Sequence, residues 1–174
     1  MEKILKCTHD EVWNVVYEGA QSALDNDELP IAAVLVRNHQ LLAMATTTDR
    51  AEKSRIAHAE LNLLQGAEKA GINLLGAQIY TSLEPCLMCL GAAHNCGISL
   101  IHYAMEAPLD GASLIDGIHS ISEFGSVHVS RGQYPTLFGP QRQTPFRELF
   151  VNFLNKNIEP NGYTKWVQEM LRRV

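Results

Sequence analysis

The chain lacks any long apolar run. No stretch of its 174 residues approaches the ~20 apolar residues that a membrane-spanning helix needs. The first six residues (MEKILK) contain neither an apolar segment nor the small-residue cleavage site of a signal peptide. We therefore expect a cytoplasmic protein without a membrane partner.

Cysteines are too few for a disulfide framework, since the sequence contains only four. Two of them, Cys86 and Cys89, are three residues apart. In an intracellular protein this spacing is more typical of a metal or redox site than of a structural disulfide. Cys7 and Cys96 have no evident partner, and we expect them to be small buried apolar residues.

The sequence has no dense cluster of basic residues. The net charge is −5, with seven basic and 16 acidic side chains in residues 1–130, and seven basic and three acidic in residues 131–174. The overall acidity disfavours a surface that follows nucleic-acid phosphates. The positive balance of the C-terminal part leaves nucleic-acid contact open, but its charges are scattered, which favours a solvated helical face.

No internal repeat or low-complexity linker divides the chain. Its length lies within the ~100–200 residues typical of one domain. We predict one domain over residues 1–174, with a core at about 8–130 and a helical tail at about 140–174. Apolar periodicity, capping signals and turn residues predict strands at 31–36, 41–45, 77–82, 98–104 and 127–130, and helices at 8–24, 57–70, 84–97, 145–157 and 163–173. This order predicts an α/β protein with a three-layer α/β/α sandwich.

Four residues supply the chemistry of a catalytic metal site. His58 and Glu60 are two residues apart, and Cys86 and Cys89 follow Pro85 at i,i+3 spacing. The cysteines therefore lie on one side of a helix, close to its N-terminus, where the helix dipole favours the thiolate form. Because i,i+2 residues do not face each other along a helix, His58 and Glu60 can converge only at a helix end.

Three protein ligands, His58, Cys86 and Cys89, leave the fourth tetrahedral position of Zn²⁺ open, as catalytic zinc sites do. Zinc lowers the pKa of water toward ~7, and Glu60 is placed to act as the catalytic proton carrier. Two alternatives remain open. Cys86 and Cys89 could form a redox pair, or His94 or Cys96 could complete a structural zinc site.

These residues also carry a family resemblance. The pattern H-x-E…P-C-x-x-C resembles the cytidine-deaminase-like superfamily of zinc deaminases, in the branch of tRNA adenosine, guanine and fungal-type cytosine deaminases. The resemblance covers about residues 8–118 and is carried by segments 29–36, 57–60 and 80–92. It implies a five-stranded mixed sheet between helices, a homodimer or higher oligomer, and the roles given above for the zinc ligands and Glu60.

The resemblance also bears on substrate contacts. Ala59 and Glu84 match positions where relatives use backbone groups to hold the base and its amine. Thr47 stands where relatives typically have an asparagine that hydrogen-bonds the base. A threonine offers one hydroxyl in place of the paired donor and acceptor of an amide, so base recognition is expected to differ.

Several substrate classes are compatible with the sequence. A free purine-type base or nucleoside is favoured, because segment 144–156 weakly resembles the C-terminal segment of bacterial guanine deaminases. The same segment also reads as the apolar face of an amphipathic helix. Acids at Glu106, Asp110 and Asp116 follow the fourth strand, where relatives often place an acid against a ring nitrogen.

Other readings remain open. A tRNA substrate is possible but not favoured, and a pterin or triazine is also compatible. A non-enzymatic alternative is a catalytically silent or structural zinc-binding partner subunit, which the presence of Glu60 disfavours.

Overall fold

The computed structural model describes residues 7–114 and 134–174. Its order of elements is α1 (His9–Asp25), β1 (Ala32–Arg37), β2 (Gln40–Thr46), α2 (Ala59–Lys69), β3 (Gln78–Leu83), α3 (Leu87–Asn95), β4 (Leu100–Met105), η1 (Ala112–Leu114), β5 (Thr136–Phe138), α4 (Gln143–Lys156) and α5 (Gly162–Leu171). None of the helices in these ranges combines the length and hydrophobicity needed to cross a bilayer.

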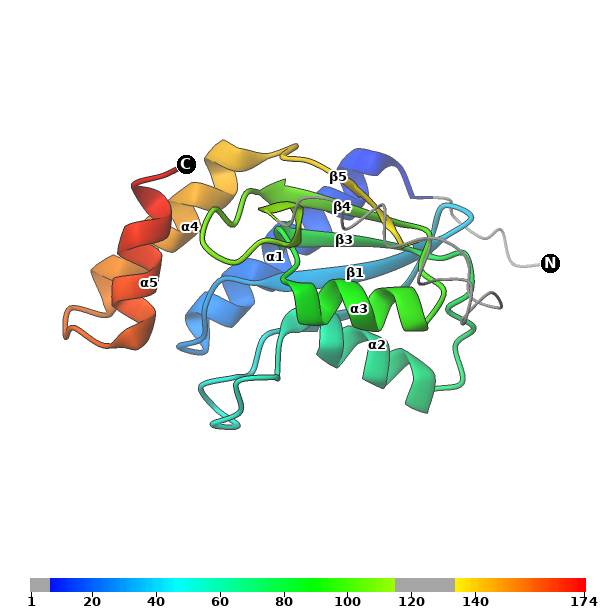
Figure 1. Cartoon of the computed structure of the whole chain (residues 1–174), viewed down its shortest axis with the longest axis horizontal. Coiled ribbons are helices and arrows are strands. Elements are labelled where there is room, and N and C mark those ends of the chain that lie inside the picture. The colour runs from blue at the N-terminus through cyan, green and yellow to red at the C-terminus, as the bar shows by residue number, and fades with distance from the viewer. Residues whose placement is uncertain (1–6, 115–133) are drawn as a thin grey trace.

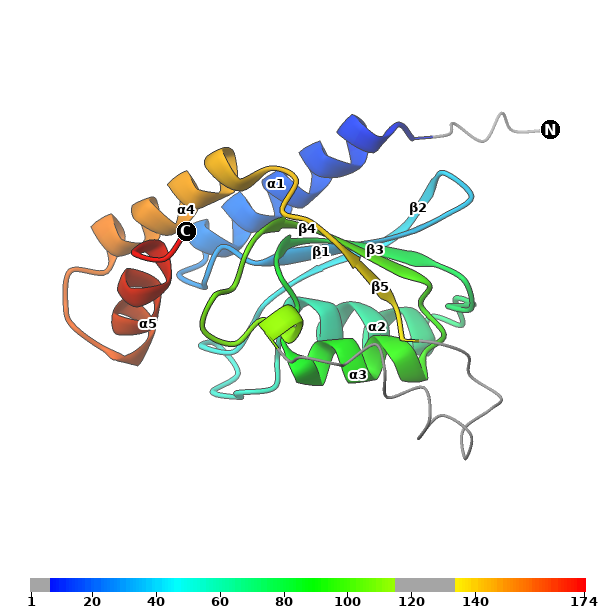
Figure 2. The same ribbon diagram turned by 45° about the horizontal axis from the view of Figure 1, so that its top comes forward.

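The five strands form one mixed sheet in the order β2-β1-β3-β4-β5. Strand β1 is antiparallel to β2 and β3, whereas β3, β4 and β5 run parallel. Helices α2 and α3 cover one face of the sheet, and α1 and α4 cover the other (Figures 1 and 2). The predicted three-layer α/β/α sandwich with a five-stranded mixed sheet is confirmed.

Strand β1 shows why the sequence has an unbroken apolar run at this point. Ala32, Val34 and Val36 pack into the core beneath α1 and α4. Ala33 and Leu35 point the other way, into the core beneath α2 and α3. Because successive side chains of a strand alternate between faces, a strand covered on both sides must be apolar throughout.

Two strands lie at the edges of the sheet, β2 and β5. The unbroken apolar run at 41–45 predicts a strand with buried faces, but β2 lies at the sheet edge, and Leu41 and Met44 are exposed. The predicted fifth strand at 127–130 lies outside the described residues. The fifth strand of the described sheet is β5, whose three residues are too few to show an alternating pattern.

The C-terminal helix α4 forms part of the hydrophobic core. Phe146, Phe150 and Phe153 of α4 are each at most 2% exposed and pack in the same cluster as α1 and β4. Their i, i+4, i+7 spacing places them on one helix face, as the amphipathic interpretation predicted. Helix α5 then packs against α4 and returns toward the sheet (Figure 2).

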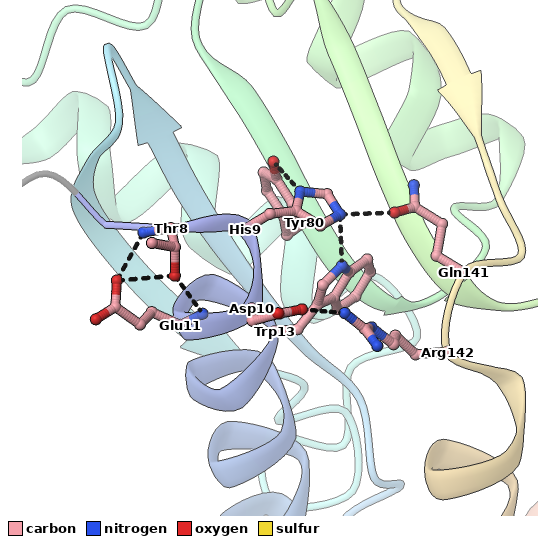
Figure 3. A network of polar contacts seen from close by, with 8 residues as sticks. All are labelled: Thr8, His9, Asp10, Glu11, Trp13, Tyr80, Gln141 and Arg142. Atoms are coloured by element: carbon pink, nitrogen blue, oxygen red, sulfur yellow. Dashed lines mark hydrogen bonds and ion pairs between the residues drawn. The ribbon is translucent and has the colours of Figure 1, made fainter.

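A histidine anchors the start of α1 to the sheet (Figure 3). The Nδ1 atom of His9 lies 3.0 Å from the Tyr80 hydroxyl on β3, and its Nε2 atom lies 2.9 Å from Gln141 Oε1. The Trp13 indole N–H donates to the same ring at 3.0 Å. A capping box formed by Thr8 and Glu11 begins the same helix.

Candidate metal centre and adjoining pocket

Two helix N-termini meet at one point. His58 is the N-cap residue of α2, and Cys86 is the N-cap residue of α3. Neither side chain caps its own helix, so both are available to other partners. The third helix was predicted to begin at Glu84-Pro85, but it begins at Leu87. Cys86 therefore has extended backbone geometry, whereas Cys89 lies within the first turn.

The spacing of the donor atoms fits zinc. His58 Nδ1 lies 3.6 Å from the Sγ atoms of both Cys86 and Cys89, and the two sulfurs are 3.5 Å apart. Tetrahedral zinc, with bonds of about 2.3 Å to sulfur and 2.0 Å to nitrogen, requires ligand atoms about 3.5–3.8 Å apart. One imidazole and two thiols at these distances are a donor set suited to zinc, the cofactor of this centre.

The two thiols differ in acidity. Their mutual hydrogen bond, followed by that with His58, lowers the pKa of Cys86 to about 4 against the effect of burial. The same contact with Cys86, and then burial, raises the pKa of Cys89. Hydrogen bonding to Cys86 raises the pKa of His58, although burial opposes it. The cluster thus holds one thiolate, which is the form that binds a metal.

Glu60 lies beside this cluster. Its side chain is only 3% exposed. Its Oε1 atom accepts a hydrogen bond of 2.6 Å from the Thr81 hydroxyl on β3, and its Oε2 atom lies 3.4 Å from Cys89 Sγ. Burial raises the pKa of the carboxyl group, chiefly because the charged form loses hydration. A raised pKa favours the uptake of a proton by this carboxyl group, which suits a residue that transfers protons.

A pocket of about 500 Å³ opens onto this centre. Its volume lies within the range of small-molecule sites. His58, Glu60 and Cys86 line it, together with the three residues predicted to contact substrate: Thr47, Ala59 and Glu84. The structure therefore places every predicted site residue except Cys89 on the pocket wall, and Cys89 directly behind it.

The three predicted substrate contacts differ in what they offer. The Thr47 hydroxyl donates to the Ala57 carbonyl at 3.1 Å, so its hydrogen is already used. The Glu84 carboxylate accepts from the backbone N–H groups of Ala107 and Ser113. The Glu84 side chain thereby fixes the loop after β4, and Ala59 is fully buried.

The alternative fourth ligands lie elsewhere. In the part of the chain that the structure describes, the only group able to hold a metal is His58, Cys86 and Cys89. His94 stacks on Tyr134, and Cys96 Sγ lies 3.9 Å from a Glu68 oxygen. Like Cys7, Cys96 is half-buried rather than buried as expected.

Sequence reasoning missed part of the pocket wall. Asp49, Arg55, Tyr163 and Trp166 line the pocket alongside Asp110, one of the predicted loop acids. Glu106 is exposed, and Asp116 lies outside the described residues. The missed residues come from an irregular loop and from α5, more than 100 positions later, and no periodicity connects the two segments.

Comparisons with known proteins agree with this geometry. Residues 6–105 match the family model described as the cytidine and deoxycytidylate deaminase zinc-binding region. The tRNA-specific adenosine deaminase of Bacillus subtilis is 36% identical over 109 residues, which cover 61% of this chain and 68% of that protein. The enzyme of the same name from Agrobacterium fabrum is 38% identical over 95 residues, which cover 53% of this chain and 62% of that protein.

Solved structures extend the likeness to most of the chain. A tRNA deaminase studied for A-to-I editing at the wobble position superposes with a TM-score of 0.67 at 27% identity, covering 81% of this chain and 99% of that one. The guanine deaminase of Nitrosomonas europaea superposes with a TM-score of 0.64 at 20% identity, covering 87% and 86%. The second likeness concerns the fold alone.

Proposed function

The chain belongs to the cytidine and deoxycytidylate deaminase zinc-binding family, and from that premise we propose that it deaminates a free base or nucleoside, with a purine type favoured. Members of this family are zinc-dependent hydrolases of C–N bonds, and this chain is an enzyme of that class. The observation that carries the substrate proposal is that α5 of the same chain lines the pocket, through Tyr163 and Trp166.

In this proposal His58, Cys86 and Cys89 hold the zinc ion. Bound there, zinc supplies Lewis acidity that makes water a nucleophile at neutral pH. Thr81 holds Oε1 of Glu60, which leaves Oε2 to carry protons. The water oxygen adds to the ring carbon that bears the amine. Glu60 takes one proton from the water and delivers it to the ring nitrogen. It then takes the proton of the added hydroxyl group and delivers it to the amine, the C–N bond breaks, ammonia leaves, and the oxygen remains as a carbonyl.

The pocket wall supports a small substrate rather than a polynucleotide. Asp49, Glu84 and Asp110 line it together with Glu60, whereas Arg55 is the one lysine or arginine among the described lining residues. Carboxylates repel phosphates, while they accept hydrogen bonds from the N–H groups of an amino-heterocycle.

The second candidate function is tRNA adenosine deamination. It is supported by the two curated relatives of that name and by the wobble-editing structure, which this chain covers almost completely. This reading requires α5 to leave room for a nucleotide that remains attached to its neighbours.

An ammonia-release screen separates these functions. The zinc-loaded protein is incubated with free bases, nucleosides and tRNA, and inosine in the tRNA is measured in parallel. We expect ammonia from at least one base or nucleoside and no inosine in tRNA. Inosine formation without turnover of any base would establish the second candidate. Bound zinc with no turnover of any substrate would favour a silent subunit.

Two further features belong to this proposal. The enzyme acts as a homodimer, which light scattering of the purified protein tests. Residues 1–174 form one deaminase domain, because α4 contributes three buried phenylalanines to the core. A chain that ends before residue 140 is therefore expected to be insoluble or unfolded, as measured by circular dichroism.

A further inference from the structure

The loop between β2 and α2 places a carboxylate on the pocket wall with an unsatisfied oxygen. Asp49 lines the pocket and is 8% exposed. Its Oδ1 atom is buried and has no hydrogen-bond partner among the described residues. Buried carboxylates normally accept several hydrogen bonds or pair with a cation, since an unsatisfied charged oxygen destabilises the fold. An exception on a pocket wall therefore points to a ligand.

The neighbours of Asp49 do not neutralise it. None of the ion pairs in the described ranges includes Asp49. Glu28 and Tyr163 each share a side-chain hydrogen bond with Asp49, but neither is a cation. Burial raises the pKa values of both groups, and so does the contact with Asp49, although backbone hydrogen bonds oppose the rise at Glu28. The adjacent Arg50 directs its guanidinium to the Asp27 carbonyl and over the Tyr163 ring.

The loop that presents Asp49 is fixed in place. The Glu28 carboxylate accepts the backbone N–H of Arg50 at 3.1 Å and that of Ala51 at 2.7 Å. These two bonds hold the backbone directly after Asp49. A preorganised acceptor loses little conformational entropy when it binds a ligand, which is the property of a recognition residue.

Asp49 also lies close to Thr47, the position where the asparagine that binds the base in relatives is absent. It is two residues beyond Thr47, whose hydroxyl hydrogen is committed to Ala57. Both side chains line the same pocket as Glu60. Asp49 is thus a buried carboxylate on this wall, and its Oδ1 atom still lacks a donor.

We propose that Asp49 determines specificity by accepting hydrogen bonds from N–H groups of the substrate, and so selects heterocycles that carry a second exocyclic amine or a protonated ring nitrogen besides the amine that is removed. The substrate class is then an amino-heterocycle with a donor edge rather than one with a single amine. This inference rests on the proposed function, since it concerns substrate binding in the same pocket.

Binding of two purines that differ by one amine tests the proposal. Glu60→Gln protein, loaded with zinc so that binding is measured without turnover, is titrated calorimetrically with 2,6-diaminopurine and with adenine. We expect the diaminopurine to bind about 10-fold more tightly or better, because a hydrogen bond to a charged group discriminates by at least that factor. Adding Asp49→Leu should reduce the ratio to less than about threefold, and Asp49→Asn should give an intermediate ratio.

The matched control is Glu52→Gln, since Glu52 is an exposed acid of the same loop. It should leave the ratio unchanged. A ratio near one before Asp49 is changed, or a ratio that survives Asp49→Leu in folded, zinc-loaded protein, would overturn the proposal. Asp49→Asn keeps the test decisive if the leucine variant does not fold.

The wild-type ammonia screen distinguishes the two proposals. An Asp49-dependent binding ratio without turnover of any substrate would refute the deaminase proposal alone. Turnover combined with an Asp49-independent ratio would refute this inference alone.

Discussion

Replacing Glu60 by glutamine tests the proposed proton transfer most directly. Glutamine has nearly the same volume and retains an oxygen that can accept the 2.6 Å hydrogen bond from Thr81, but it cannot carry a proton. Positioned general acid–base groups contribute about 10²–10⁴-fold to rate, so kcat should fall by that factor, equivalent to about 3–5 kcal/mol of activation free energy.

The stability of the same variant provides a second prediction with a definite sign. Burial raises the pKa of Glu60 above its value in the unfolded chain. The folded state therefore binds this proton more tightly, and the associated stability is lost as the pH rises through the folded-state pKa. Above the folded-state pKa of Glu60 the wild type carries the cost of a buried charge that Glu60→Gln lacks. The variant should be as stable as the wild type or more stable at pH 7, and the difference should disappear in acid.

The assay combines kcat at saturating substrate, zinc content by elemental analysis and unfolding midpoints at several pH values. Glu68→Gln is the control, because Glu68 is an exposed acid on the same helix. Turnover at the parent rate by folded, zinc-loaded Glu60→Gln would refute the reasoning. Loss of zinc together with loss of rate would instead assign Glu60 to metal retention.

Further predictions concern the core, the loop after β4, pH and the metal. Phe150→Ala should lower the unfolding free energy by about 3–5 kcal/mol in urea titrations, because the ring is fully buried. Gly111→Ala should reduce both stability and kcat, since an added Cβ would lie 2.4 Å from a Glu84 oxygen; Gly66→Ala, with nothing within 4 Å, is the control. Burial and then the charge of a neighbouring histidine lower the pKa of His102 to about 4. As the pH falls, the unfolded chain therefore takes up this proton before the folded chain does. The free energy of unfolding should decrease as the pH drops from about 6.5 to 4. The unfolding temperature of His102→Phe should decrease less over the same range. Chelation of zinc should lower the unfolding midpoint in thermal-shift assays and zinc addition should restore it, because a metal that binds only the folded state stabilises that state.

The metal centre could be predicted from sequence because its geometry is local. His58 and Cys86 are N-cap residues, and Cys89 follows within one turn, so short-range helix rules already bring each donor to a helix end. Short-range helix rules do not predict that the N-termini of α2 and α3 lie next to each other. That requires β3 and β4 to be parallel neighbours with α3 as the connection between them, which follows from the alternation of strands and helices.

The pocket wall could not be predicted in the same way. Asp49 lies in a turn-rich loop without periodicity. Tyr163 and Trp166 lie on α5, whose sequence shows only the pattern of an ordinary amphipathic helix. These residues come together only because α4 determines the position of α5. The position of α4 in turn depends on the tertiary packing of its three phenylalanines against α1. Such packing is encoded by shape and volume rather than by a recognisable spacing.

The position of α5 therefore bears on the choice between the two substrate proposals. Trp166 donates a hydrogen bond to Asp110, whose pKa burial nevertheless raises, and Tyr163 lies against Asp49. Moving α5 aside for a polynucleotide would break both contacts and leave the carboxylates of Asp49 and Asp110 without these partners. Two such carboxylates on the pocket wall would also repel the phosphates of the polynucleotide. A free base requires no such movement, because it presents N–H donors to the same carboxylates while the helix stays in place. The contacts of α5 with Asp49 and Asp110 are thus an energetic argument for the proposed small substrate that does not depend on likeness to known deaminases.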